Sequence, residues 1–143
     1  MLPPELEAAY RRTIYRAHLP EGDVDLSIGG PAAALERALA ARGVGCWGWI
    51  TAVNPRSRPL DAATNRERNA QLRELLADRG FQVVEGTALD PSGDWQPEPS
   101  FLVPGADVDV LVALGRRFEQ LAIVVGERGG APRLVAIGGA RED

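Results

Sequence analysis

Hydrophobic and polar residues alternate in several short runs of this 143-residue chain, a pattern typical of half-buried strands. The clearest run is 23–28, where Val24, Leu26 and Ile28 would share one face. Residues 13–17 also alternate, and the Pro-Glu-Gly turn between the two runs predicts a hairpin. Further strands are predicted over 45–53, 81–85, 100–103, 121–125 and 133–137, the last two as a second hairpin.

Apolar residues three and four positions apart predict helices between these strands. The first helix is short and spans 4–11. A second is opened by Gly30-Pro31, with Pro at the first helical position, and ends at Gly43. Asp61 is expected to cap a third helix that Gly80 stops, and Asp107 a fourth that runs to about Phe118.

After the first helix the predicted order is β-β-α-β-α-β-β-α-β-β. The simplest arrangement is a single α+β domain over residues 1–143, with a mixed β-sheet and about three to four helices packed mainly on one face. We expect a core over about 10–137 and a frayed C-terminal tail at 138–143.

A polar block at 51–58 follows the most apolar predicted strand, and it runs into the third helix. On a helical wheel of about 100° per residue, Asn65 falls within about 20° of Leu72 and Leu76, and Asn69 lies at about 40°. These amides therefore lie on the leucine face. A buried amide without partners costs roughly 1–3 kcal/mol, so we expect them to bond to the 54–58 loop.

Two interpretations of this block stay open. In the first, the amides only hold the loop, and the Arg residues are solvated or paired with acids. In the second, amides, guanidinium groups and the helix N-terminus line a pocket for a small anion such as a phosphate, a nucleotide or a carboxylate. The candidate ligand-binding residues are Asn54, Ser57, Arg58, Asn65, Arg68, Asn69, Trp95, Glu98 and Gln120.

The long loop at 89–99 would form the lid of such a pocket. Trp95 either stacks on a ligand or holds the loop against the sheet. Glu98 is either a general base or the partner of an Arg. Gln120 either bonds a strand edge or contacts the ligand. Asp90 and Asp94 with Glu98 match no metal-binding loop, so no metal site is predicted.

The composition excludes several chemistries. All 16 basic residues are Arg, so Schiff-base and P-loop lysines are absent. Single copies of His18 and Cys46 exclude the usual His/Cys zinc sites and an intrachain disulfide. No nucleophile–base pair is visible, so catalytic residues stay unassigned and no cofactor is expected. A binding or regulatory module is favoured over a hydrolase or transferase that uses Glu98 as base.

Charge and hydropathy limit the partners. The net charge is −4, and without a basic cluster the chain does not fit a nucleic-acid binder. No apolar run reaches membrane-spanning length, and the acidic N-terminus does not fit a signal peptide. We therefore expect a cytoplasmic protein of undetermined oligomeric state. The competing class is a protein–protein adaptor, with Trp47, Trp49 or Phe101 in an exposed patch.

Four motifs in this order resemble the bacterial family called domain of unknown function 3293. They are Ile50-Thr-Ala-Val-Asn-Pro-Arg-Ser57, Asn65-x-x-Arg68-Asn69-x-x-Leu72, Asp90-Pro-Ser-Gly-x-Trp95-x-x-Glu98-x-Ser100 and Gly115-Arg-Arg-Phe118-x-Gln120-x-Ala-Ile123. The resemblance covers nearly the whole chain, most firmly 45–125. It implies a small stand-alone cytoplasmic bacterial protein and, because the family has no assigned activity, no mechanism. The family often has Asn where this chain has Leu121, so a site that used this Asn would be altered here.

Overall fold

The computed structural model describes residues 2–137, so the predicted frayed tail at 138–143 lies outside the described residues. The described part contains four α-helices, one short 3-10 helix and seven strands. The helices are α1 (Pro4–Arg12), α2 (Ala33–Ala41), α3 (Ala62–Asp78) and α4 (Val108–Arg117), with the 3-10 helix η1 at Pro55–Ser57. The strands are β1 (Ile14–Leu19), β2 (Gly22–Leu26), β3 (Cys46–Ile50), β4 (Val84–Leu89), β5 (Glu98–Pro104), β6 (Ala122–Glu127) and β7 (Arg133–Ala136).

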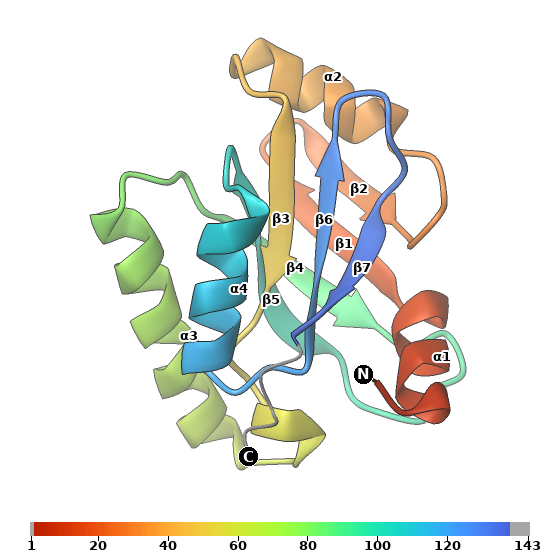
Figure 1. Ribbon diagram of the computed structural model, residues 1–143, viewed down its shortest axis with the longest axis vertical. Coiled ribbons are helices and arrows are strands. Elements are labelled where there is room, and N and C mark those ends of the chain that lie inside the picture. The colour runs from red at the N-terminus through yellow and green to blue at the C-terminus, as the bar shows by residue number, and fades with distance from the viewer. Residues whose placement is uncertain (1, 138–143) are drawn as a thin grey trace.

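The seven strands form one curled sheet in the order β2-β1-β4-β5-β3-β6-β7 (Figure 1). Both predicted hairpins are present, β1 with β2 and β6 with β7. The predicted α+β class is confirmed, but the sheet is not mixed, because every pair of neighbours is antiparallel. The helix α3 joins β3 to β4 with β5 between them, and α4 joins β5 to β6 with β3 between them. Each helical crossover thus connects two strands of like direction that a third, opposite strand separates.

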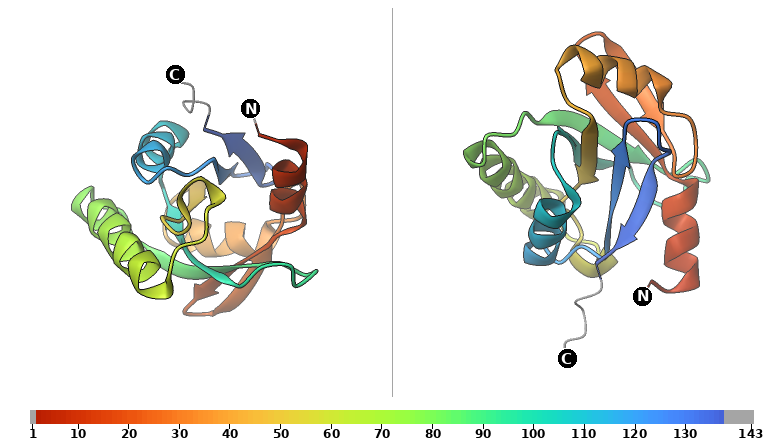
Figure 2. Two further views of the ribbon diagram at one scale, coloured as in Figure 1. Left: turned by 90° about the horizontal axis from the view of Figure 1, so that it is seen from below. Right: turned by 45° about the horizontal axis from the view of Figure 1, so that its top comes forward.

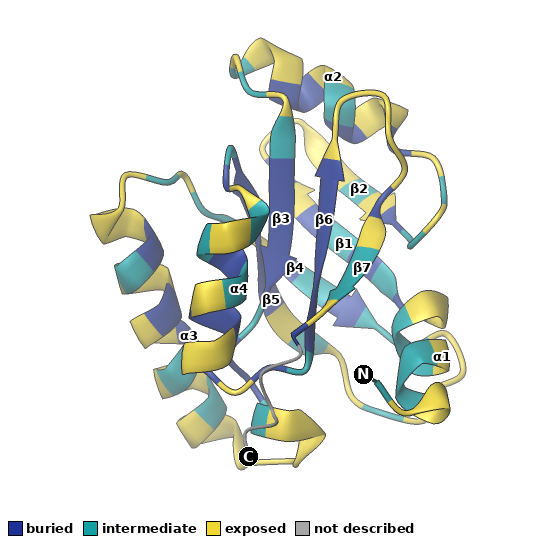
Figure 3. Cartoon of the chain, in the orientation of Figure 1, coloured by how far each residue is buried: buried dark blue, intermediate teal, exposed yellow. Residues whose placement is uncertain are grey.

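The two faces of the sheet carry separate hydrophobic clusters. On the convex face, Leu72 and Leu76 of α3 and Leu111 and Leu114 of α4 pack against Phe101 and its neighbours. On the concave face, Leu35 and Leu39 of α2 pack against both tryptophans of β3. The expectation that helices pack mainly on one face therefore holds for α3 and α4 but not for α2. The central strands β3 and β6, covered on both sides, are almost entirely buried (Figure 3).

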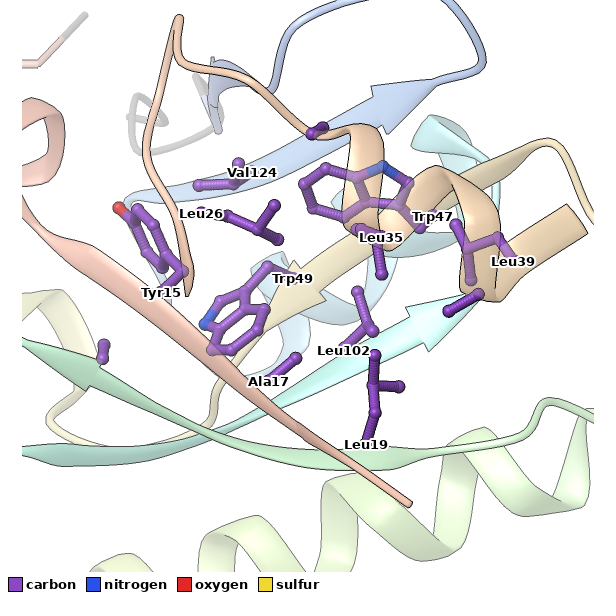
Figure 4. Packing of buried hydrophobic residues seen from close by; sticks show 13 residues of the cluster. Tyr15, Ala17, Leu19, Leu26, Leu35, Leu39, Trp47, Trp49, Leu102 and Val124 are labelled. Carbon is purple, nitrogen blue, oxygen red and sulfur yellow. The ribbon is translucent and has the colours of Figure 1, made fainter. Parts of the chain in front are cut away.

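Two tryptophans of β3 fill the concave face (Figure 4). Glycines on other strands make room for them. A Cβ atom on Gly126 of β6 would collide with the Trp47 indole, and one on Gly86 of β4 would collide with Trp49. The Trp49 ring therefore reaches across β5 to β4. It also meets the Tyr15 ring edge-on, with centroids 5.5 Å apart. Both indoles lie close against the sheet because no side chain covers the backbone at these two positions.

Two strand boundaries differ from the sequence-based prediction in a way that matters for the site. Phe81 and Val83, expected in a strand, instead pack in the segment that leads from α3, and β4 begins at Val84. The strand β5 begins at Glu98, opposite Ala88, and not at Ser100. Side chains alternate along a strand, so Glu98 shares the concave face with Ser100 and Leu102. Its carboxylate is thus placed by a strand and not by a loop.

The close packing of β3 against α4 predicts a selective effect of adding one methyl group. In Gly48→Ala the new Cβ collides with the buried Leu111 side chain. We expect a loss of about 1–3 kcal/mol in unfolding free energy, as for other overpacked cores. Gly45→Ala, just before the same strand, is the control, because nothing lies within 4 Å of its added Cβ. Urea melts of both variants measure the difference, and equal stabilities would contradict this packing.

Candidate functional site

Side chains satisfy the backbone of the segment that leaves β3. Thr51 Oγ1 accepts a hydrogen bond from Val53 N–H, and Gln120 Nε2 donates to the Val53 carbonyl at 3.0 Å. Side chains of α3 bond to the remaining groups. The N–H and C=O of Ala52 and Val53 and the N–H of Asn54 therefore each have a side-chain partner. The segment has left the sheet, so no strand could supply these partners.

Asn69 is the buried amide of this set. Its Oδ1 accepts the Ala52 N–H at 2.8 Å, and its Nδ2 donates to the Pro99 carbonyl at 3.0 Å. Thr51 Oγ1 donates to the same Pro99 carbonyl at 2.8 Å. One amide thus joins the exit of β3 to the start of β5.

Asn65 and Asn54 form a reciprocal pair one turn nearer the start of α3. Asn65 Oδ1 accepts the Asn54 N–H at 3.0 Å, and Asn65 Nδ2 donates to Asn54 Oδ1 at 2.8 Å and to the Leu60 carbonyl at 3.3 Å. Asn65 is half-buried, less than its place on the leucine face suggests, but its predicted bonds to the 54–60 backbone are present. Asn54 keeps its amide nitrogen for another partner.

Arg68 faces the backbone and not a ligand. Its guanidinium donates to the Ala52 carbonyl and to the Phe118 carbonyl, both at 2.6 Å, and lies 5.7 Å from the centre of the Phe118 ring. Arg58, directly after η1, is exposed and lines neither of the two cavities near these loops. The two cations expected to attract an anion are therefore absent from the site, since one is used by the backbone and the other faces solvent.

A cavity of about 280 Å³ lies at the open end of the concave face, between α1 and η1. At about 30 Å³ per water molecule, it has room for roughly nine waters or a small organic molecule. Both elements lie at the same end of the sheet (Figures 1 and 2). Its polar and aromatic lining residues are Tyr10, Thr13, Tyr15, Trp49, Thr51, Asn54, Ser57, Trp95, Glu98, Ser100 and Gln120.

Glu98 is the only charged side chain among the described residues that line this cavity. Asn54 Nδ2 donates to its Oε2 at 2.9 Å, and no residue the structure describes donates to Oε1. Burial raises the pKa of Glu98, and the bond from Asn54 offsets this only partly. Burial, together with the charge of Glu98, also raises the pKa of Tyr10 to about 12. The site therefore holds a carboxyl group whose charge no described cation balances.

Trp49 presents an unused donor in the same cavity. The residue is 3% exposed, and its indole Nε1–H has no hydrogen-bond partner in the described part of the chain. Figure 4 shows the nitrogen edge of this indole turned to the side on which Tyr15 lies. The Tyr15 hydroxyl, by contrast, donates to the Tyr10 carbonyl at 3.1 Å. A buried donor without a partner costs about 1–3 kcal/mol, which a ligand or a water molecule in the cavity would recover.

A second, larger cavity of about 850 Å³ lies on the other side of Glu98, beside α3. It is lined by Asn65, Asn69, Arg66 and Arg73, which the first cavity lacks. Arg73 is already paired with Glu85 at 2.6 Å and lies over the Phe101 ring. Asn54, Trp95 and Glu98 line both cavities.

The loops at the cavity carry unusual backbone geometry. The non-glycine residues with positive φ in the described chain are Asn54, Arg56, Ser57 and Glu119, with values from 49° to 62°. Residues in this region are strained by sterics. The two loops are joined where Arg56 N–H donates to the Glu119 carbonyl at 2.7 Å. Strain at this one place, maintained by the bonds to Asn65 and Gln120, is typical of binding and catalytic sites.

Seven of the nine predicted site residues line one or both cavities. The structure brings Asn54, Ser57, Trp95, Glu98 and Gln120 together around the first cavity. Asn65 and Asn69 lie at the second, and Arg58 and Arg68 at neither. Sequence reasoning missed five lining residues of the N-terminal helix and hairpin, which are Leu6, Ala9, Tyr10, Thr13 and Tyr15, and it assigned Trp49 to an adaptor surface. The spacing of Leu6 and Tyr10, both in the lining, is the one signal that would have suggested a wall of α1 here.

The residues expected to form an adaptor surface are buried. Trp47, Trp49 and Phe101 are 2%, 3% and 6% exposed. Leu60, at 37%, is the large hydrophobic side chain that the described chain leaves exposed. The strand β3, which carries both tryptophans, is covered on both faces, so no exposed patch forms from them.

The acidic side chains of residues 90–98 contact neighbouring groups of the chain. Asp90 accepts hydrogen bonds from Ser92 and from the Asp94 N–H, and Arg12 lies 3.5 Å from it. Within residues 2–137 no cluster of His, Cys, Asp and Glu has the arrangement that a metal ion needs. Nor does any helix there have the length and apolarity to cross a bilayer.

The fold and cavity define a small α+β domain with a polar and aromatic pocket on the concave face of a curled antiparallel sheet. A family model described as "Protein of unknown function (DUF3293)" matches residues 50–123, and the chain belongs to this family. That segment includes all nine candidate residues but not Tyr10, Tyr15 or Trp49. Comparisons with curated proteins and with solved structures gave no significant match.

The contacts of Asn69 and Arg68 predict that both stabilise the ligand-free protein. Asn69→Ala and Arg68→Ala each leave buried backbone groups of Ala52 without a partner. We expect each variant to lose about 1–3 kcal/mol in unfolding free energy. Gln71→Ala and Arg66→Ala, exposed on the same helix, are the controls and should change stability by less than about 0.5 kcal/mol. Urea melts without ligand measure this. An Arg68→Ala variant as stable as its control would contradict the role of Arg68 in holding the loop.

The raised pKa of Glu98 predicts that removing its charge increases the unfolding free energy, by an amount that depends on pH. Burial raises this pKa above the ordinary value of 4.5, so the folded state binds the proton more tightly than the unfolded chain. The stability that this proton contributes is fully present below about pH 4.5, and it is lost as the pH rises through the raised pKa of Glu98. Glu98→Gln, which keeps an acceptor for Asn54, should therefore be more stable than wild type at pH 7, with the smallest difference at pH 4.

Urea melts at several pH values between 4 and 7 test this prediction. The control is Glu5→Gln, which removes one charge from an exposed position of α1. A stability difference for Glu98→Gln that is flat across this range, or that favours wild type at pH 7, would contradict the desolvated carboxyl group.

Proposed function

We propose that this protein is a small-molecule-binding module whose ligand occupies the cavity over Trp49. The observation that carries the proposal is the pairing, in one cavity, of a half-buried carboxyl group without a cation and a buried indole N–H without an acceptor. Buried polar groups are nearly always satisfied in folded proteins. The Trp49 N–H is not satisfied by the described chain, and it shares a space of about 280 Å³ with a carboxyl group that no cation pairs, which supports a site that a ligand completes.

The anion expected from the sequence is less well supported than binding itself. Neither Arg58 nor Arg68 lines the first cavity, and its only charged lining group is a carboxylate. An anion would have to use the second cavity, where Arg66 and Arg73 lie. Because Arg73 is paired with Glu85 and Glu98 lines that cavity too, we assign the ligand to the first cavity.

Catalysis by Glu98 is the second candidate. A carboxyl group with a raised pKa is suited to general acid–base chemistry. However, the residue that bonds it is Asn54, which is neither a nucleophile nor a base. Binding therefore remains the better-supported function, and an adaptor role loses its basis with the burial of Trp47 and Trp49.

The compartment is part of the same proposal. We favour the reducing cytoplasm of a bacterium, as the family resemblance implies. The thiol of Cys46 is free and half-buried, and burial raises its pKa, which suits an unreactive thiol.

A filled cavity should abolish ligand binding without unfolding the protein. We expect a thermal-shift screen of metabolites to give ligands that stabilise the wild type, by about 2.7 kcal/mol at a hundred times Kd. Ala9→Leu adds bulk to the α1 wall of the cavity and should remove these shifts. Ala8→Leu, one residue away on the exposed side of α1, is the matched control and should keep them.

Two results would contradict the proposal. One is a broad screen without any stabilising compound. The other is a set of ligands whose shifts survive in Ala9→Leu, because their site would then lie elsewhere on the protein.

A further inference from the structure

The first cavity combines aromatic rings with a single negative charge. Four rings line it, those of Tyr10, Tyr15, Trp49 and Trp95, and they come from α1, β1, β3 and the loop before β5. No Arg, Lys or His is among the described lining residues. The faces of aromatic rings carry partial negative charge and attract cations. The lining thus combines one carboxyl group, no cationic side chain and four rings of a kind that attracts cations.

The carboxyl group at the centre of this lining is held in place but not neutralised. Asn54 fixes Oε2 of Glu98 by a 2.9 Å bond, and Asn54 is itself held by Asn65 and by Leu60 N–H. No described cation forms a salt bridge with Glu98. A charged group taken out of water without a partner is costly, and a positively charged ligand would recover that cost through a charge-assisted hydrogen bond.

The Arg residues of the neighbouring elements lie outside the lining of the first cavity. Arg73 pairs with Glu85 and lies over Phe101, and Arg66 lines the second cavity from the exposed face of α3. Arg12, on α1, lies near Asp90 and Asp94. The net charge of the whole chain, −4, also favours the approach of a cation.

From this arrangement we propose that the ligand of the first cavity is a small organic cation, an ammonium compound whose nitrogen bonds to Glu98 among the four aromatic rings. This inference rests on the proposed function and adds the chemical class of the ligand. The unpaired Nε1–H of Trp49 lies in the same lining and offers a donor to any oxygen that the ligand carries.

Three probes of nearly equal shape and different charge test the assignment: benzylamine, benzyl alcohol and benzoate. Isothermal titration calorimetry of the full chain at pH 7 measures their affinities. We expect benzylamine to bind at least ten-fold more tightly than benzyl alcohol, and benzoate to bind most weakly, because Glu98 attracts the first and repels the last.

Variants locate the source of the preference. Glu98→Gln keeps the bond to Asn54 and removes the charge, so benzylamine should lose about ten-fold or more in affinity while benzyl alcohol changes little. Glu5→Gln makes the same change in net charge at an exposed position of α1 and should leave all three affinities unchanged. The comparison of probes on the wild type stands even if a variant folds poorly.

The possible results separate this assignment from the proposed function. Equal or tighter binding of benzyl alcohol or benzoate overturns the cationic class and leaves small-molecule binding in place. A benzylamine preference that persists in Glu98→Gln also overturns it, because the charge would then lie elsewhere. If none of the three probes binds, the cationic assignment fails, and the proposed function then depends on the metabolite screen with Ala9→Leu.

Discussion

The site depends on how the backbone of residues 52–54 is satisfied. The strand β3 lies between β5 and β6, so its continuation leaves the middle of the sheet and loses the hydrogen-bond partners that a strand provides. Five side chains replace them: Thr51, Asn65, Arg68, Asn69 and Gln120. Each unsatisfied buried group would cost about 1–3 kcal/mol. This cost is large relative to the marginal stability of a small domain, so the polar block is first of all structural.

That structural role also positions the chemistry. The bonds from α3 hold Asn54 in a left-handed conformation, with φ of 49°, and its side chain then reaches Glu98 on β5. The curl of the sheet brings α1 over the same end, and the two indoles of β3 fill the rest of the concave face against Gly86 and Gly126. The space that remains is the cavity. The two interpretations of the polar block are therefore not exclusive, because the residues that hold the loop also place the one carboxyl group of the pocket.

Local features of the sequence predicted local features of the fold well. Asp61 and Asp107 cap α3 and α4 through bonds to Thr64 N–H and Val110 N–H, as helix-capping chemistry requires. The period of the helix correctly placed Asn65 and Asn69 on the side of α3 that carries its leucines. The wheel could not place the long side chain of Arg68 on the same helix. Its guanidinium could turn either toward backbone carbonyls or toward a ligand. A helical wheel gives the side of the helix on which Cβ lies, but it does not give the position of the guanidinium. The third strand inserted in each helical crossover, and the wall that α1 adds to the cavity, depend on distant contacts that no local pattern encodes.

The indole N–H resonances of the protein give the most direct test of the central claim, that the cavity over Trp49 is a ligand site. The chain has three tryptophans, and Trp47 lies on the same concave face but outside the cavity lining. In a titration with benzylamine and with benzyl alcohol, followed by ¹⁵N–¹H NMR, the account predicts that the Trp49 Nε1–H resonance moves and saturates with the better-binding probe, while that of Trp47 stays in place. A saturable binding event that leaves the Trp49 resonance unmoved would contradict it.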